Sequence, residues 1–346
     1  MSQRFAAFRV IPGALAGAAG LLLAAAAPAG ATSSSFTVRA IVTDATGAHT
    51  VDTNLVNPWG MAQGPASPVW VSNNGTGTST LYTDGAAPKI PLTVTIPGGA
   101  PTGQAFNGST GFAVTTAGKS APAKFIFASE AGVISGWSTG ATAVVGRLIP
   151  GAVYKGLAIN GTGSFARLYA TDFAHGRVDV FGPTWKRVTP VGSFRDALLP
   201  AGYSPFGIQT IGGQLYVSYA LRYGKDDVGG AGHGYVDVYS STGALVKRLI
   251  RGGALNSPWA MAMAPAGWGS FGGDLLVGNF GDGRIHAYDV HGVLKGTLAH
   301  NGRAIVLPGL WGLLFGNGTS AAKNALMFTS GPGGEAHGRW GVITVG

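Results

Sequence analysis

The sequence predicts an all-β fold and, within that class, a six-bladed β-propeller with four-stranded blades. Three observations lead to this prediction. A unit of turn, strand, hairpin and strand recurs at intervals of about 50 residues, which is the spacing of propeller blades. The strands are short, rich in β-branched and aromatic residues and bounded by turn residues, with no 3.6-residue helical pattern between them. The 59 glycines among 346 residues supply the tight turns that such a fold needs.

The repeat is clearest in the fifth unit. There a Ser-Pro-Trp-Ala turn opens a strand (257–262), and Leu-Leu-Val-Gly-Asn (275–279) follows it. The same order occurs near the N-terminus, where Asn-Pro-Trp-Gly (57–60) precedes Val-Trp-Val-Ser-Asn (69–73). Aligning the units on the small residue that opens each first strand gives six anchor positions, Gly60, Gly103, Gly156, Gly207, Ala260 and Gly312. Six anchors predict six blades.

The elements follow the same pattern in chain order. A β-branched strand at 36–43, ended by the Asp44–Gly47 turn, precedes the first unit. The strands expected in the first three units are 59–62, 69–72, 78–83 and 90–96, then 112–116, 125–129, 133–137 and 143–149, then 155–159, 168–172, 177–181 and 187–194. Those expected in the last three units are 205–208, 215–219, 235–239 and 245–250, then 257–262, 274–279, 283–288 and 293–298, then 311–315, 325–329 and 340–345.

Two early units carry irregularities. In the first, Pro91 within the fourth strand predicts a blade edge, because no neighbouring strand there needs the missing N–H. In the second, Pro-Thr-Gly (101–103) stands in place of the Pro-Trp-Gly turn, and an Asn-Gly hairpin (107–108) delays the strand at 112–116. We therefore expect the second blade to be the least regular.

The last three units add an insertion and a missing strand. A glycine-rich segment, 220–234, separates the second and third strands of the fourth unit, carries Asp226 and Asp227, and is predicted to be an inserted loop. The sixth unit has three strands, while the strand at 36–43 belongs to no unit. We therefore predict that the N-terminal strand pairs with residues 340–345, completes the last blade and closes the ring.

Residues 1–31 are predicted to be a signal peptide, and residues 32–346 a single propeller domain. Arg4 and Arg9 precede an apolar run (10–27) that ends in Ala-Gly-Ala (29–31), the small-x-small pattern of a signal-peptidase site. The alternative, a membrane anchor, is less favoured because Pro12 and several glycines dilute the run. We expect an exported protein, periplasmic or extracellular, with no membrane span after cleavage.

Composition restricts the partners and the source of stability. The net charge is +9, but no run of five basic residues occurs, so we expect no nucleic-acid partner. The chain has no cysteine, and without disulfides its stability has to come from core burial and sheet closure. We expect a monomer.

Several motifs resemble known propeller families. Val-Ser-Asn (71–73) before Leu-Tyr (81–82), and Leu-Tyr-Ala-Thr-Asp (168–172), resemble NHL-type repeats of six-bladed propellers. Asn-Leu-Val-Asn-Pro-Trp-Gly (54–60) with Trp-Val-Ser-Asn-Asn-Gly-Thr-Gly (70–77) resembles a family of exported bacterial propeller proteins of unassigned function. This resemblance extends over essentially the whole mature chain. It implies a fold and a compartment, and no reaction.

Candidate ligand-binding residues lie where the first strands begin and the second strands end. In a propeller these positions share one face, at the mouth of the central channel. The candidates are Trp59, Asn73, Asp172, Phe206, Trp259, Asn279 and Trp311. Aromatic rings and amides of this kind can stack on and hydrogen-bond a polar ligand. The alternative is structural, with Asn and Asp capping the turns and Trp packing between blades.

Catalytic and metal chemistry is weakly indicated. Cysteine is absent, which excludes a thiol nucleophile, and we assign no catalytic residue. We expect no resident cofactor, with calcium as the alternative. The side chains that offer the oxygens calcium takes are those of Glu130, Asp172, Asn279 and Asp282.

Two functions remain open. The first is a binding or scaffold protein that recognises a polar ligand, a glycan or a protein, on one propeller face. Trp59, Trp259 and Trp311 begin blades 1, 5 and 6, which are adjacent in a closed ring, and such an aromatic sector favours a glycan. The second is a metal-dependent propeller enzyme, of lactonase or lyase type, acting in the central channel.

Overall fold

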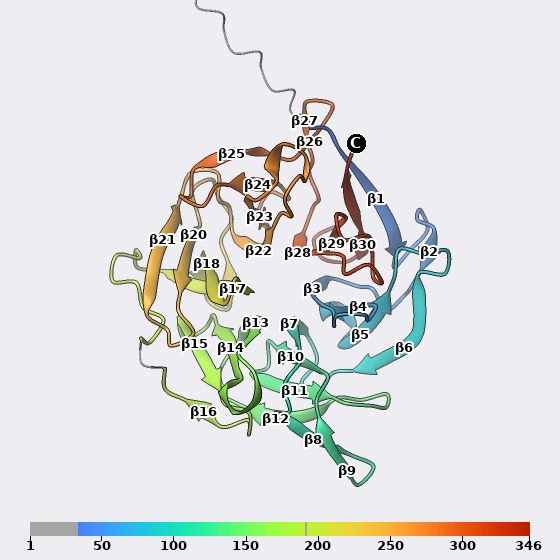
Figure 1. Ribbon diagram of the computed structural model, residues 1–346, viewed down its shortest axis with the longest axis vertical. Coiled ribbons are helices and arrows are strands. Elements are labelled where there is room, and N and C mark those ends of the chain that lie inside the picture. Colours follow the sequence, from blue (N-terminus) through green and yellow to red (C-terminus); the bar gives the residue numbers. More distant parts are fainter. Residues whose placement is uncertain (1–33, 191) are drawn as a thin grey trace, which may run out of the picture. The chain divides into compact units, whose positions relative to one another are not determined.

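Six antiparallel sheets surround a central axis in the computed structural model, which describes residues 34–190 and 192–346. The sheets follow one another around the ring in chain order, with the first strand of each nearest the axis (Figure 1). The predicted fold class, a six-bladed β-propeller with four-stranded blades, is confirmed. The predicted signal peptide lies outside the described residues.

Each blade is one antiparallel sheet. Blade 1 contains β3 (Pro58–Ala62), β4 (Val69–Asn73), β5 (Thr78–Tyr82) and β6 (Lys89–Thr95). Blade 2 contains β7 (Pro101–Phe106), β10 (Phe125–Ser129), β11 (Val133–Trp137) and β12 (Val144–Leu148). Blade 3 contains β13 (Tyr154–Asn160), β14 (Arg167–Asp172), β15 (Arg177–Phe181) and β16 (Arg187–Val188).

The second half of the ring has the same order. Blade 4 contains β17 (Tyr203–Ile211), β18 (Gln214–Tyr223), β20 (Tyr235–Tyr239) and β21 (Leu245–Arg251). Blade 5 contains β22 (Pro258–Met263), β23 (Leu275–Asn279), β24 (Ile285–Tyr288) and β25 (Leu294–Thr297). Blade 6 contains β28 (Leu310–Phe315), β29 (Leu326–Ser330), β30 (Arg339–Val345) and β1 (Phe36–Thr43).

Short elements decorate the blades. The additional strands are β2 (Thr50–Val51), β8 (Ala113–Thr116), β9 (Lys119–Pro122), β19 (Asp226–Asp227), β26 (Ala299–His300) and β27 (Arg303–Ala304). The 3₁₀ turns are η1 (Asn74–Thr76), η2 (Gly163–Phe165) and η3 (Gly269–Phe271). In the described part of the chain no helix is long and apolar enough to span a membrane.

The apolar core lies between the blades. Every residue of the second strands β4, β10, β23 and β29 is buried, because a neighbouring sheet covers each face. Outer strands such as β21 expose alternate residues. Six clusters of buried apolar side chains each join two adjacent blades. The core is therefore a ring of six interfaces.

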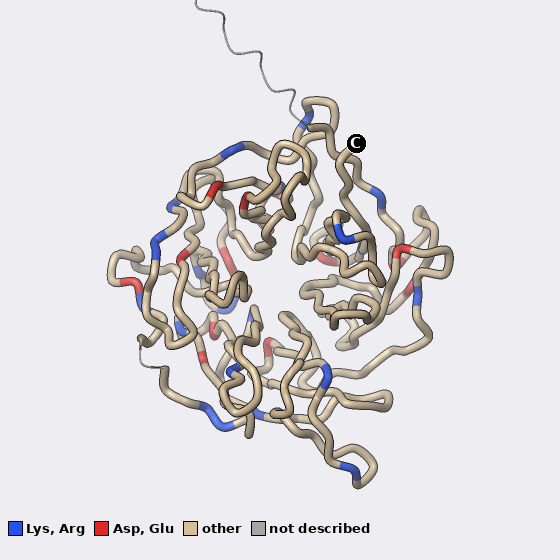
Figure 2. Tube along the Cα trace, in the orientation of Figure 1, with Lys and Arg blue, Asp and Glu red and all other residues tan. Residues whose placement is uncertain are grey.

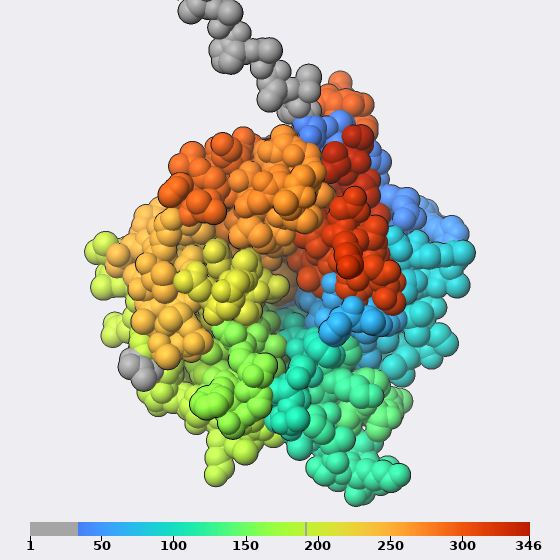
Figure 3. All heavy atoms as spheres, in the orientation of Figure 1, coloured from blue at the N-terminus to red at the C-terminus, as the bar shows by residue number. Residues whose placement is uncertain are grey.

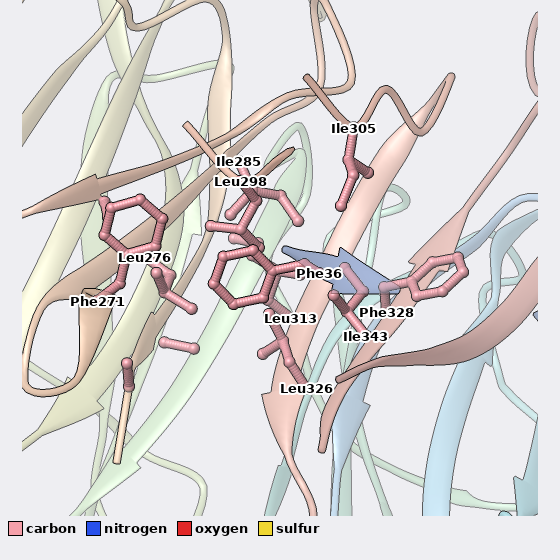
Figure 4. Packing of buried hydrophobic residues seen from close by; sticks show 14 of the residues in the cluster. Phe36, Phe271, Leu276, Ile285, Leu298, Ile305, Leu313, Leu326, Phe328 and Ile343 are labelled. Carbon is pink, nitrogen blue, oxygen red and sulfur yellow. The ribbon is translucent and has the colours of Figure 1, made fainter. Parts of the chain in front are cut away.

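The N-terminal strand closes the ring. β1 pairs with β30 antiparallel, from Phe36 opposite Val345 to Thr43 opposite Arg339. Figure 4 shows Phe36 between side chains of blade 5 and blade 6. Its ring centroid lies 4.8 Å from that of Trp268. The predicted completion of the last blade by residues 36–43 is confirmed.

The anchor glycines let the six first strands approach the axis closely. At Gly312, a Cβ atom would lie 2.7 Å from the backbone oxygen of Trp59 in the next blade. At Gly60, it would lie 2.6 Å from the backbone oxygen of Thr102. Glycine at these positions therefore permits a narrow lumen at the level of the anchor residues, about 30 Å³, which widens to about 230 Å³ further along the first strands.

Three strand predictions are wrong. The first strand of blade 2 is β7, since Pro-Thr-Gly (101–103) keeps the anchor position, and residues 113–122 form a separate hairpin, β8–β9. The outer strand of blade 3 ends at Val188, and positive φ angles at Ser193 and Phe194 break the extended conformation expected up to residue 194. The insertion 220–234 is partly strand, because β18 extends to Tyr223 and pairs with β19.

Candidate binding site at one mouth of the central channel

Aromatic side chains close one mouth of the channel. We call this cluster the aromatic plug, and its members are Trp59, Phe173, Phe206, Ala220, Trp259, Phe280 and Trp311. Four predicted site residues belong to it, each located next to the anchor position of its own blade. Because they occupy equivalent positions in the repeat, these rings lie close together near the axis.

The rings form a stacked column. The centroid of Trp311 lies 3.4 Å from that of Trp59 and 4.0 Å from that of Phe280, with the planes within 21° of parallel. Trp259 meets Trp311 edge-on at 5.8 Å. The predicted convergence of the three tryptophans is found. Trp59 and Trp311 are buried, however, so most of their surface contacts protein, and only Trp259 is half-buried.

The three predicted polar residues lie at the ends of second strands and are fully buried. Asn73 donates hydrogen bonds to the hydroxyls of Thr78 and Thr80, at 3.1 and 3.0 Å. Asn279 donates to the backbone oxygen of Ala254 at 2.8 Å.

Asp172 accepts a hydrogen bond from the backbone N–H of Val153 and pairs with Arg177 at 2.9 Å. All three polar residues hold turns and strand ends together, as the structural alternative expects. Direct ligand binding by these three residues stays a prediction, and it would require them to become exposed.

A buried lysine lies beside the plug. Lys155 follows Tyr154 at the start of β13 and is 3% exposed. Its Nζ lies 2.6 Å from Glu130 Oε1 and 5.1 Å from the centroid of the Trp59 ring. Asp226 of the blade 4 insertion lies 3.8 Å from the same nitrogen. The ammonium group is thus held by an ion pair and by the π-face of an indole.

The Glu130 carboxylate links this lysine to blade 1. Its Oε2 atom accepts a hydrogen bond from Asn74 Nδ2 at 3.1 Å. Burial acts to raise the pKa of Glu130, but the Lys155 charge and the hydrogen bonds from Lys155 and Asn74 outweigh it and lower the pKa. Glu130 is therefore ionised at neutral pH.

Two further carboxyl groups face a cavity of about 300 Å³ that adjoins the plug. Asp227 comes from β19, Glu335 from the loop between β29 and β30, and Phe280 from the turn after β23. Figure 3 shows a hollow near the centre of the ring, between the yellow, orange and red segments of blades 4, 5 and 6. Three blades thus contribute one wall each to the cavity.

Burial raises the pKa of both cavity carboxyls. For Asp227, burial outweighs the opposing effects of the Ser257 hydroxyl and the Lys155 charge. For Glu335, burial outweighs Asn57 and Lys155, and the charges of Glu130 and Asp227 raise the pKa further. Basic residues lie mainly toward the outside of the ring, whereas acidic residues also occur close to its centre (Figure 2). The residues that line the cavity include these two carboxyls and no lysine, arginine or histidine.

Lys155, Asp227 and Glu335 were not predicted as site residues from the sequence. A signal existed for Lys155, because it occupies the position that holds tryptophan in blades 1, 5 and 6. Asp227 was visible only as a charge in an insertion. No pattern marked Glu335, since its place depends on how two distant loops meet.

The carboxylates considered as calcium ligands do not converge. Glu130 pairs with Lys155, Asp172 with Arg177, and Asp282 lies 3.6 Å from Arg284. Within residues 34–190 and 192–346, no group of three or more His, Cys, Asp or Glu side chains could hold a metal ion. The residues present therefore do not fit a metal site built from these carboxylates.

The fold and this site define a class of protein, a six-bladed β-propeller with an aromatic closure at one channel mouth. No protein-family model matches the sequence. The chain is 33% identical over 286 residues to uncharacterized protein R648 of Acanthamoeba polyphaga mimivirus, covering 77% of this chain and 70% of that protein. It is also 33% identical over 285 residues to uncharacterized protein L690 of the same virus, covering 76% and 74%. The chain belongs to the family of these uncharacterized mimivirus proteins.

Solved structures share the architecture. Virginiamycin B lyase from Staphylococcus aureus superposes with a TM-score of 0.54 at 12% identity, over 90% of this chain and 99% of the lyase. A gluconolactonase from Xanthomonas campestris superposes with a TM-score of 0.52 at 14% identity, over 85% and 89%. At these identities the likeness shows the fold alone.

Proposed function

We propose that the protein is a binding protein that takes a polar ligand at the plugged mouth of the channel. One observation carries this proposal: Asp227, Glu335 and Phe280 converge, from three different blades, on one open cavity. A concave site with a few polar groups and an aromatic wall is the usual form of a ligand pocket. The lumen directly below the plug is only about 30 Å³, which favours the mouth over this part of the channel as the site for a ligand.

A glycan or a protein surface is the proposed ligand class. The Phe280 ring in the cavity wall offers an aromatic face to a sugar ring, and the cavity carboxyls accept hydrogen bonds from hydroxyl or amino groups. We further propose that the protein is exported and meets this ligand in the periplasm or outside the cell, because residues 1–31 have the pattern of a signal peptide.

The experiment is a glycan array, with a protein pull-down, on the mature protein and on the double variant Asp227→Asn, Glu335→Gln. We expect the variant to lose binding while its melting temperature stays unchanged or rises, since it removes buried charge. Asp84→Asn, in the turn between β5 and β6 at the other end of blade 1, is the matched control and should bind normally. Ligands that bind the double variant as well as the original protein would place the binding surface elsewhere.

The metal-dependent enzyme has no specific observation in its favour among the described residues. Metal analysis of purified protein, with and without chelator, tests it directly. A tightly bound metal whose removal lowers the melting temperature would support the metal-dependent enzyme.

A further inference from the structure

Neither cavity carboxyl forms an ion pair within the described residues, although the more distant Lys155 charge acts on both. Among the described residues, neither Asp227 nor Glu335 has a lysine, arginine or histidine nitrogen within 4.0 Å, whereas Glu130 has Lys155. Glu335 Oε1 is also buried without a hydrogen-bond donor in the described chain. Burying a carboxylate oxygen without a hydrogen-bond donor costs free energy of folding, so the free protein has an unsatisfied hydrogen-bond acceptor at this point.

A second, independent observation lies beside Asp227. The Ser257 side chain is fully buried, and its hydroxyl has no hydrogen-bond partner of normal geometry in the described residues. It nevertheless lies near enough to the Asp227 carboxyl to lower its pKa. Ser257 does not line the cavity, so it adds a buried hydroxyl next to Asp227, while the acceptor without a donor among the described residues is Glu335 Oε1.

The remaining wall is apolar or backbone. Phe280 lines the cavity and stacks on Trp311, and glycines from four loops supply most of the rest. The backbone of Glu335 has a φ angle of 70°, a left-handed conformation that is unfavourable for a glutamate. The loop thus holds this carboxyl in the cavity wall against a local conformational preference.

We infer that this cavity binds the primary ammonium group of a ligand, with the adjoining carbon atoms packed on Phe280. This inference rests on the proposed function and specifies its ligand class. An ammonium group donates three hydrogen bonds and carries the charge that the two carboxyls lack. A quaternary ammonium has no N–H group to donate to either carboxyl. A neutral sugar would supply donors but no charge.

The test measures binding of paired probes to the mature protein by calorimetry. n-Butylammonium is compared with 1-butanol, and D-glucosamine with N-acetyl-D-glucosamine, so that each pair differs in the ammonium group. We expect both ammonium probes to bind at least tenfold more tightly than their neutral partners. Glu335→Gln and Asp227→Asn should each weaken ammonium binding about tenfold. Asp84→Asn should not change it, and melting curves confirm that each variant is folded.

The outcomes separate this inference from the proposed function. Equal binding of the charged and neutral probes, or no binding of either, overturns the ammonium site. If neutral glycans bind on the array while both ammonium probes fail, the proposed function stands and the inference falls. If the ammonium probes bind as expected but no glycan or protein ligand is found, the inference stands and the proposed ligand class is wrong.

Discussion

The ammonium nitrogen of Lys155 lies 2.6 Å from the Glu130 carboxylate, although the lysine is almost completely buried. Their contact joins blade 3 to blade 2 at the mouth of the channel. Because the pair is largely removed from water, the charge of each partner is compensated mainly by the charge of the other.

We therefore expect Lys155→Met to lower the free energy of unfolding by about 3 kcal/mol, since it leaves Glu130 uncompensated. Urea unfolding measures the loss. Adding Glu130→Gln to the variant should restore part of it. Arg284→Met, which removes an exposed pair with Asp282, is the control and should cost less than about 0.5 kcal/mol. A loss at Lys155 as small as the control would show that the buried pair contributes little.

Ring closure gives a second prediction. Deleting residues 36–43 should strongly destabilise the protein, because blade 6 loses its outer strand and exposes an edge. Phe36→Ala should alone cost about 3–5 kcal/mol through the cavity it leaves between blades 5 and 6. Thermal unfolding tests both. Val345→Ala, at an exposed position of the same sheet, is the control. A deletion variant melting within a degree or two of the original protein would contradict the closure.

The close approach of the first strands of neighbouring blades at the axis gives a third prediction. Gly312→Ala should destabilise the protein by about 3 kcal/mol or more, since the new Cβ would meet the Trp59 backbone oxygen and the Thr329 hydroxyl. Gly85→Ala adds a methyl group whose nearest neighbour is 3.6 Å away, so its effect should stay within about 0.5 kcal/mol. Comparable stabilities of the two variants in urea would argue against the tight lumen.

The Asp237 carboxyl in blade 4 gives a pH dependence. Burial, helped by the charge of Asp196, raises its pKa from 3.8 to about 6, although Arg251, Arg248 and a hydrogen bond from Tyr239 act in the opposite direction. The folded protein thus binds this proton more tightly than the unfolded chain. The resulting stability is complete below pH 3.8 and is lost as the pH rises through about 6.

Asp237→Asn should therefore gain stability relative to the original protein as the pH rises from 4 to 7, by on the order of 2–3 kcal/mol. Urea unfolding at several pH values measures the difference. A difference that does not change with pH would mean that Asp237 has an ordinary pKa in the folded protein.

Export gives the fifth prediction. Protein recovered from outside the cytoplasm should begin at Thr32, because cleavage is expected after Ala31. N-terminal sequencing or intact-mass measurement decides this. Exported material that begins at Met1 or Ser2 would remove the signal-peptide interpretation.

The sequence was sufficient for the fold because the determinants of a blade are local. Turn residues, alternating apolar positions and one small anchor repeat within each unit, and an unpaired strand at 36–43 could complete only the unit that lacked one. The strand 112–116 was misplaced because an inserted hairpin separates the anchor at Gly103 from the second strand. Local patterns do not reveal which segment is the insertion.

The site was only partly predictable. Convergence of Trp59, Trp259 and Trp311 followed from their equivalent places in adjacent blades, but their burial depended on how closely the rings stack. The meeting of Asp227 and Glu335 depends on the paths of two loops from different blades. Residue types alone do not determine such paths, so the acidic cavity required the structure.

The pairing of β1 with β30 also has a consequence for biosynthesis. The five other blades lie between the two strands in the sequence, so the ribosome must have synthesised residues 339–345 before the last blade can form. Until then blade 1 lacks its neighbour on one side, and the apolar residues of that side are exposed. Contacts between residues so far apart in the sequence also form slowly. If the chain is exported through a membrane as an unfolded polypeptide, the ring can close only after residues 339–345 have crossed. Chaperone protection during that interval would then be a requirement for an adequate yield.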